Sequence, residues 1–134
     1  MKEPNFQSKN KNYALVSTSF YGYITGIKSK ATGKWLALKY GKEKVLGYRV
    51  EHQQAKSKHI VERLHSFHFP SERAMINAEI ECRRIFQKEA QQMYGRKGKL
   101  TEAEFSDGHS ETTLTMNYQL IVDIYEKHGG IVIC

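Results

Sequence analysis

The first sixty residues of this chain combine positive charge with aromatic rings. They contain 12 Lys and Arg against 3 Asp and Glu, whereas residues 101–134 contain 1 against 6. Tyr and Trp side chains are interleaved with these lysines, and such a mixture suits a polyphosphate that carries stackable bases. The pattern predicts a nucleic-acid-binding surface made of Lys28, Lys30, Lys34, Trp35, Lys39, Lys42, Lys44 and Arg49. Trp35 could instead be buried as the anchor of a sheet.

A second group of residues could support catalysis. His59 and Arg63 are four residues apart, so one helical turn would place them on the same face. An imidazole beside a guanidinium could then act as acid or base and as stabiliser in metal-independent RNA cleavage. No carboxylate stands at a fixed spacing to orient the histidine, so we expect these residues not to be catalytic.

The sequence gives no sign of a metal or a cofactor. His65 and His68 supply at most two ligands, and Cys82 and Cys134 extend them to no known metal spacing. No phosphate-binding loop, dinucleotide fingerprint or nucleophile elbow is present. We therefore expect neither a bound metal nor a cofactor.

Size and composition are those of a small globular protein. At 134 residues with 40% apolar and 26% charged residues, the chain can bury one core. No apolar run is long enough for a membrane span, and the polar start is unlike a signal peptide. Two distant cysteines do not suggest a disulfide framework. These features predict a cytoplasmic protein that does not bind membranes.

The first half of the chain is typical of a sheet. Residues 1–12 are expected to form a flexible basic arm, and residues 13–134 a single α+β domain. Strand-like residues from Tyr13, a polar turn at 28–33, and strands at 35–40 and 45–50 predict a three-stranded antiparallel meander. Residues 52–69 fit a helix and a strand equally well.

The second half is expected to hold the main helix and a β-hairpin. Ser71 and Gly95 provide the caps for a helix over 72–94. Its predicted buried stripe is Met75, Ala78, Cys82, Ile85, Phe86, Ala90 and Met93. Strict alternation over 113–124 and the apolar residues 131–134 then predict a C-terminal hairpin. The acidic segment 102–111 could be a solvated loop, a cover for the basic sheet, or a surface for a basic protein.

The Gly- and Lys-rich meander resembles a known DNA-binding family. Gly26-Ile27, Gly33-Lys34-Trp35-Leu36-Ala37 and Leu46-Gly47-Tyr48, followed by a helix, resemble the Apetala-type (ethylene-response-factor-like) domain and integrase arm-type DNA-binding domains over roughly residues 20–95. The resemblance implies a sheet face in the major groove, with Lys28, Lys30, Lys34, Trp35 and Lys39 at the contact. Lysines replace the usual arginines, which favours phosphate contacts over base readout.

The leading hypothesis is a non-enzymatic nucleic-acid-binding protein, a regulator or accessory factor that would suit a phage or mobile element, with DNA favoured over RNA. One alternative is a protein inhibitor that docks in a nucleic-acid-processing enzyme. The other is the ribonuclease built on His59 and Arg63. The C-terminal hairpin could carry a homodimer or protein-partner interface, because an apolar terminal strand can recruit another chain.

Overall fold

The computed structural model describes residues 19–133, and over this range the chain forms an α+β fold with an antiparallel sheet. The expected basic arm at 1–12 lies outside the described residues. The central strand β2 (Tyr21–Lys28) pairs with β3 (Trp35–Glu43) on one side and β4 (Ile60–His68) on the other. Two short strands, β5 (Thr112–Thr113) and β6 (Ile131–Val132), extend the edges to the order β5-β3-β2-β4-β6.

The turn between β2 and β3 lies where the sequence predicts it. The backbone N–H of Ser29 donates to Lys34 O at 2.9 Å, and that of Gly33 donates to Ser29 O at 2.8 Å. Gly33 has a φ of 73°, in the left-handed region that glycine adopts without steric cost. The second predicted strand is confirmed and continues to Glu43, and the first is confirmed from Tyr21 to Lys28. Its expected beginning at 13–18 lies outside the described residues.

The predicted third strand at 45–50 is wrong. That segment forms a turn and then the helix α2 (Tyr48–Lys56), and the third strand of the central sheet is β4. The Glu43 carboxylate accepts hydrogen bonds from the backbone N–H groups of Gly47 and Arg49, both at 2.9 Å. These bonds satisfy backbone donors at the start of the helix. The segment was predicted as a strand because it contains the β-branched residues Val45 and Val50.

The predicted main helix is confirmed as α3 (Glu72–Tyr94). Ser71 Oγ accepts a hydrogen bond from Ala74 N at 3.1 Å, and Gly95 ends the helix with a φ of 72°. The buried residues of the helix are Met75, Ala78, Glu79, Cys82, Phe86 and Ala90. Met93 was expected in this stripe but is 54% exposed, because the last turn extends past the core.

The predicted C-terminal hairpin is wrong. Residues 118–127 form the helix α4 (Tyr118–Lys127), preceded by short 3-10 turns at His109–Glu111 (η1) and Thr115–Asn117 (η2). The helix buries Ile121, Ile124 and Tyr125, which follow helical spacing. The strand β6 pairs with β4 instead of folding back on residues 113–124.

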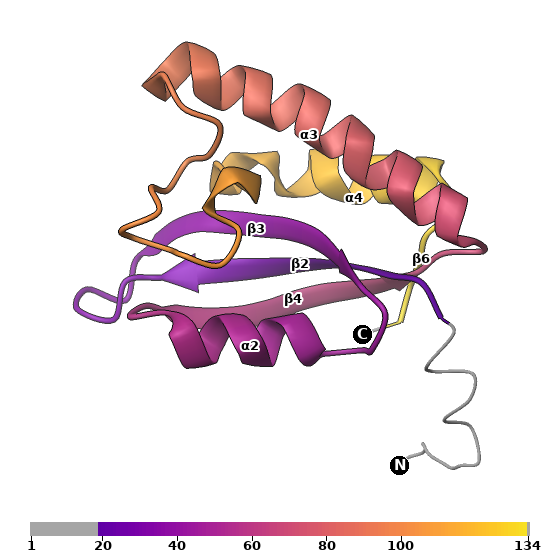
Figure 1. Cartoon of the computed structure of the whole chain (residues 1–134), viewed down its shortest axis with the longest axis horizontal. Coiled ribbons are helices and arrows are strands. Elements are labelled where there is room, and N and C mark those ends of the chain that lie inside the picture. Colours follow the sequence, from indigo (N-terminus) through magenta and orange to yellow (C-terminus); the bar gives the residue numbers. More distant parts are fainter. Residues whose placement is uncertain (1–18, 134) are drawn as a thin grey trace.

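Helices cover both faces of the sheet, as Figure 1 shows, with α3 and α4 on one side and α2 on the other. The larger core lies under α3 and α4 and includes Ile24, Tyr40, Phe67, Phe86 and Tyr125. A smaller core on the α2 side contains Ile27, Ala37, Val61, Leu100 and Phe105, so the segment after α3 also packs on this side. The middle of the sheet is therefore not open to a ligand.

Tyr125 connects the last helix to the centre of the sheet. Its hydroxyl accepts a hydrogen bond from Gly41 N at 3.2 Å and lies 3.1 Å from Tyr23 O and 3.2 Å from Gly41 O. A Cβ at Gly22 would approach the Phe69 ring to 2.8 Å and the Tyr125 ring to 3.1 Å, so a larger residue there would displace an aromatic ring of the core. Burial raises the pKa of Tyr125 well above its ordinary value, which keeps the hydroxyl protonated.

The C-terminal residues that were expected in the hairpin lie at a sheet edge. Ile131, Val132 and Ile133 are all exposed there. The hairpin on which a homodimer or partner interface was predicted is thus absent, and the interface itself stays a prediction. Among residues 19–133, no helix has both the length and the apolar character needed to cross a membrane.

Candidate nucleic-acid interface

In the structure, the eight predicted binding residues lie in three separate places. Trp35 and three lysines lie at the β2–β3 hairpin end, Lys39 lies inside the protein, and three cations line a pocket at the other end of β3. We call the first group, Lys28, Lys30, Lys34 and Trp35, the hairpin surface. Figure 1 shows this hairpin at the end of the sheet away from the first turn of α3.

Trp35 lies directly over Gly26 on the neighbouring strand. A Cβ added at Gly26 would overlap the six-membered ring of Trp35, so the indole occupies the space that a side chain would fill. The residue is nevertheless 44% exposed. The tryptophan is therefore a surface ring held in place by a glycine, and the alternative of a buried core anchor is wrong.

The other members of the hairpin surface are three lysines, one of which contacts this ring. The Lys28 ammonium lies 4.8 Å from the centroid of the Trp35 ring and 3.2 Å from a Glu62 carboxylate oxygen. Lys30 and Lys34 are exposed on the turn, whose backbone is fixed by the Ser29 and Gly33 hydrogen bonds. The turn thus presents two exposed lysines in the segment that leads into Trp35, and Lys28 contacts the ring itself.

Lys39 is fully buried, which is incompatible with its predicted role on the surface. Its ammonium donates to Tyr23 Oη at 3.0 Å, Tyr40 O at 2.7 Å and Glu111 Oε1 at 3.1 Å. Burial lowers the pKa of Lys39, but Tyr23 and Glu111 outweigh it, so the net pKa is raised above the ordinary value. The residue remains charged and holds β3 to the segment that follows α3.

Glu111 belongs to a chain of charges that the sequence gives no reason to group. Besides Lys39, it accepts a hydrogen bond from Arg83 Nε at 2.8 Å. Burial would raise the pKa of Glu111, yet Lys39 and Arg83 hold it below the usual carboxyl range. Glu111 is 72 positions from Lys39 in the sequence, so no local spacing could reveal the pair.

The acidic segment 102–111 packs against the protein and does not form a solvated loop. Phe105 is buried, and Asp107 Oδ1 lies 3.3 Å from Arg49 Nη2. His52 Nε2 is 3.9 Å from the same carboxylate. Arg49 is thus engaged by an internal acid, as Lys39 is by Glu111, so the segment neutralises part of the basic charge that the sequence placed on the surface.

The remaining predicted cations, Lys42 and Lys44, lie at the far end of β3 from the hairpin surface. Both are exposed, and Lys42 Nζ is 3.6 Å from Glu79 Oε1 on α3. Together with Arg49 they border a pocket whose other wall is the first turn of α3. The contribution of Met75 and Ile76 to this wall could not be read from the sequence, where Met75 only belongs to the buried stripe of the predicted helix.

The helical turn that the ribonuclease alternative needs to bring His59 and Arg63 together is not formed. Both would need one helix, but α2 ends at Lys56 and β4 begins at Ile60. Along an extended strand, residues this far apart in sequence are separated by on the order of 10 Å. His59 instead forms the connection, with its N–H bound to Ser57 Oγ at 3.0 Å. The ribonuclease alternative thereby loses its geometric basis.

Histidines, cysteines and carboxylates are not gathered for metal binding. Within residues 19–133, no group of three or more such side chains could hold a metal ion. Cys82 is buried in the core under α3, where desolvation raises the pKa of its thiol. The thiol is therefore kept in its protonated, unreactive form.

No protein-family model matches the chain, and comparisons with curated proteins and with solved structures also find no match. The resemblance to Apetala-type and integrase arm-type domains stays a prediction, although its expected third strand at Leu46–Tyr48 is a turn and a helix start. The function of this chain must therefore be inferred from its own geometry.

Proposed function

We propose that this chain is a non-enzymatic nucleic-acid-binding protein that engages a single strand with its hairpin surface. The observation that carries this proposal is the ring of Trp35, which is seated on Gly26, 44% exposed, and flanked by Lys28. An exposed tryptophan held in a fixed orientation is a stacking platform for an unpaired base. The resemblance to DNA-binding domains favours DNA over RNA as the first ligand to test.

The lysines of the hairpin surface supply the complementary phosphate contacts. Ammonium groups bind phosphates as point charges and do not read base edges in the bidentate manner of arginine. A strand whose base stacks on Trp35 would place its flanking phosphates near Lys30 and Lys34, since the turn extends from the same strand end. Binding of this kind is expected to be tolerant of sequence and sensitive to salt.

The first prediction concerns salt dependence. Replacing Lys28, Lys30 and Lys34 with Gln is expected to weaken binding to a thymidine oligonucleotide. It should also reduce the slope of log affinity against log salt by about 2, because each phosphate contact on a single strand contributes about 0.7. Trp35 is the only tryptophan of the chain, so quenching of its fluorescence measures both affinity and stacking.

The matched control removes three charges elsewhere. Arg73, Arg84 and Lys88 are exposed on α3, and their replacement by Gln changes the net charge by the same amount. We expect this variant to keep most of the salt slope. Equal losses in the two variants would mean that overall charge, not the hairpin surface, attracts the strand. A wild-type protein that leaves both DNA and RNA unbound at low salt would overturn the proposal and favour the protein-inhibitor hypothesis.

A further inference from the structure

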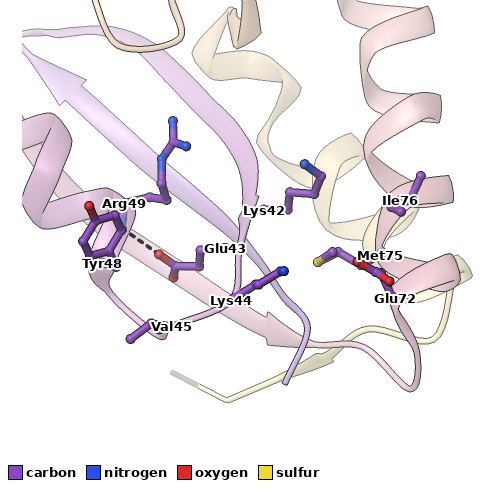
Figure 2. A pocket seen from close by; sticks show the side chains of 9 residues that line it. All are labelled: Lys42, Glu43, Lys44, Val45, Tyr48, Arg49, Glu72, Met75 and Ile76. Carbon is purple, nitrogen blue, oxygen red and sulfur yellow. Dashed lines mark hydrogen bonds between the residues drawn. The ribbon is translucent and has the colours of Figure 1, made fainter. Parts of the chain in front are cut away.

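A second concave site lies at the opposite end of β3 from the hairpin surface. Figure 2 shows the side chains around a pocket between the end of β3, the first turn of α2 and the first turn of α3. The pocket has a volume of about 400 Å³. Its volume falls within the range of sites that bind small molecules. The pocket is lined by Lys42, Glu43, Lys44, Val45, Tyr48, Arg49, Glu72, Met75 and Ile76.

One side of the pocket is cationic. The side chain of Lys44, just after β3, extends toward the first turn of α3 (Figure 2), and that of Lys42 reaches Glu79 on the next turn. Lys42 lies 3.6 Å from Glu79 and keeps 41% of its side chain exposed, so its ammonium remains accessible. The start of α2 offers no rival anion site, because the Glu43 carboxylate already binds the N–H groups of Gly47 and Arg49. An anion entering the pocket would therefore bind between the two lysines.

The other surfaces of the pocket are apolar or aromatic. Met75 is buried and Ile76 half-buried, and they form the α3 wall. Tyr48 lies across from them and is 59% exposed. Its ring is stacked on His52, with 6.0 Å between centroids and 13° between planes. This stacked pair gives the pocket a flat aromatic rim in a fixed orientation.

The combination of these groups identifies a class of ligand. We propose that the pocket binds a nucleoside monophosphate, with its phosphate between Lys42 and Lys44 and its base against Tyr48. Glu72, exposed in the first turn of α3, would accept hydrogen bonds from the sugar hydroxyls. A fatty acid would match the cations and the apolar wall but would offer no donor to Glu72. Inorganic phosphate would leave the aromatic rim and the apolar wall unused. This assignment uses no residue of the hairpin surface and does not rest on the proposed function.

Calorimetric titration with adenosine monophosphate tests this assignment. Tyr48→Ala is expected to weaken binding by about 5- to 150-fold, which corresponds to the roughly 1–3 kcal/mol that stacking of one base contributes. The double variant Lys42→Gln, Lys44→Gln should lose a similar factor for the monophosphate while retaining the affinity for adenosine. The double variant Lys30→Gln, Lys34→Gln is the matched control and should bind the monophosphate like the wild type. Thermal unfolding of each variant verifies that the fold is intact.

Trp35 fluorescence separates the two binding sites. A nucleotide in the pocket is at the far end of β3 and should leave the emission of Trp35 unchanged, whereas a nucleotide stacked on the hairpin surface should quench it. Quenching that Trp35→Ala abolishes together with the binding heat would overturn the pocket assignment. The assignment would also be overturned if decanoate bound more tightly than adenosine monophosphate or if inorganic phosphate bound equally well. It would fail, too, if the monophosphates of adenosine, guanosine, cytidine and uridine all showed no saturable binding. Loss of oligonucleotide binding alone would contradict only the hairpin surface.

Discussion

Replacing Glu111 with Ala is expected to lower the free energy of unfolding by about 3–5 kcal/mol, the usual cost of leaving one partner of a buried ion pair without the other. The Lys39 ammonium is fully buried, and Glu111 supplies the carboxylate within 3.1 Å of it. The variant also removes the acceptor of the Arg83 hydrogen bond. Urea unfolding followed by circular dichroism measures the loss.

Two further variants identify the cause of this loss. Glu102 belongs to the same acidic segment but is exposed, so Glu102→Ala makes the same charge change and should alter stability by at most about 0.5 kcal/mol. Lys39→Met removes the buried charge itself, and Glu111 keeps Arg83 as a partner, so it should cost less than Glu111→Ala. Equal stabilities for the Glu111 and Glu102 variants would contradict the buried pair.

Phe86→Ala is the second large effect and is expected to cost about 3–5 kcal/mol, because it opens a cavity in the main core. Phe86 is 1% exposed on α3, and its ring packs against Tyr40 with 5.4 Å between centroids. The same unfolding measurement applies. A decrease in the denaturant midpoint with an unchanged slope would show that stability has fallen while the surface exposed on unfolding has stayed the same.

Met93→Ala is the matched control for this variant. Met93 lies on the same helix and belongs to the apolar stripe that the sequence predicts, yet it is 54% exposed. We expect its replacement to change stability by at most about 0.5 kcal/mol. A loss as large as that of Phe86→Ala would mean that the last turn of α3 is covered, contrary to the structure.

The sequence predicts α3 almost to the residue because its ends are marked by local chemistry. Ser71 and Gly95 need only their immediate neighbours to form the caps, and both do so as expected. The turn of the β2–β3 hairpin was predictable for the same reason, since Gly33 adopts the left-handed conformation that the turn requires. Elements with such end signals can be located without knowledge of the rest of the fold.

The first residues of α2 and most of α4 were predicted as strand, whereas the rest of α2 was left open between helix and strand. In α4 the apolar residues fit two periods at once. In the C-terminal segment the alternating set includes Met116, which is 82% exposed, and Leu120, which is 41% exposed. The set that packs against the sheet is Ile121, Ile124 and Tyr125, with the spacing of a helix. The choice between the strand period and the helix period depends on which residues find a sheet face to pack against. That information comes from the tertiary structure.

The candidate sites were predicted in composition but not in arrangement. Lysine is seldom fully buried, so nothing local could single out Lys39 from its exposed neighbours. Its partner Glu111 is contributed by a distant segment that was expected to be solvated. The pocket also needs three separate elements, of which the sequence identified the lysines on β3 but not the α3 wall. The sequence pattern locates the basic residues along the chain but does not say which of them reach the surface.

The bond from Tyr125 to the sheet has a consequence for the order in which the chain can fold. Its hydroxyl reaches Tyr23 O, 102 positions earlier in the sequence, and the backbone of Gly41. During synthesis, β2 and β3 emerge long before α4, so the part of the sheet under Tyr125, around Gly22 and Gly41, stays uncovered until the last helix is made. Contacts of such long sequence separation slow folding and prolong the time during which a partly covered sheet can aggregate. The nascent chain is thus most prone to aggregate just before Tyr125 packs onto the sheet and completes the core.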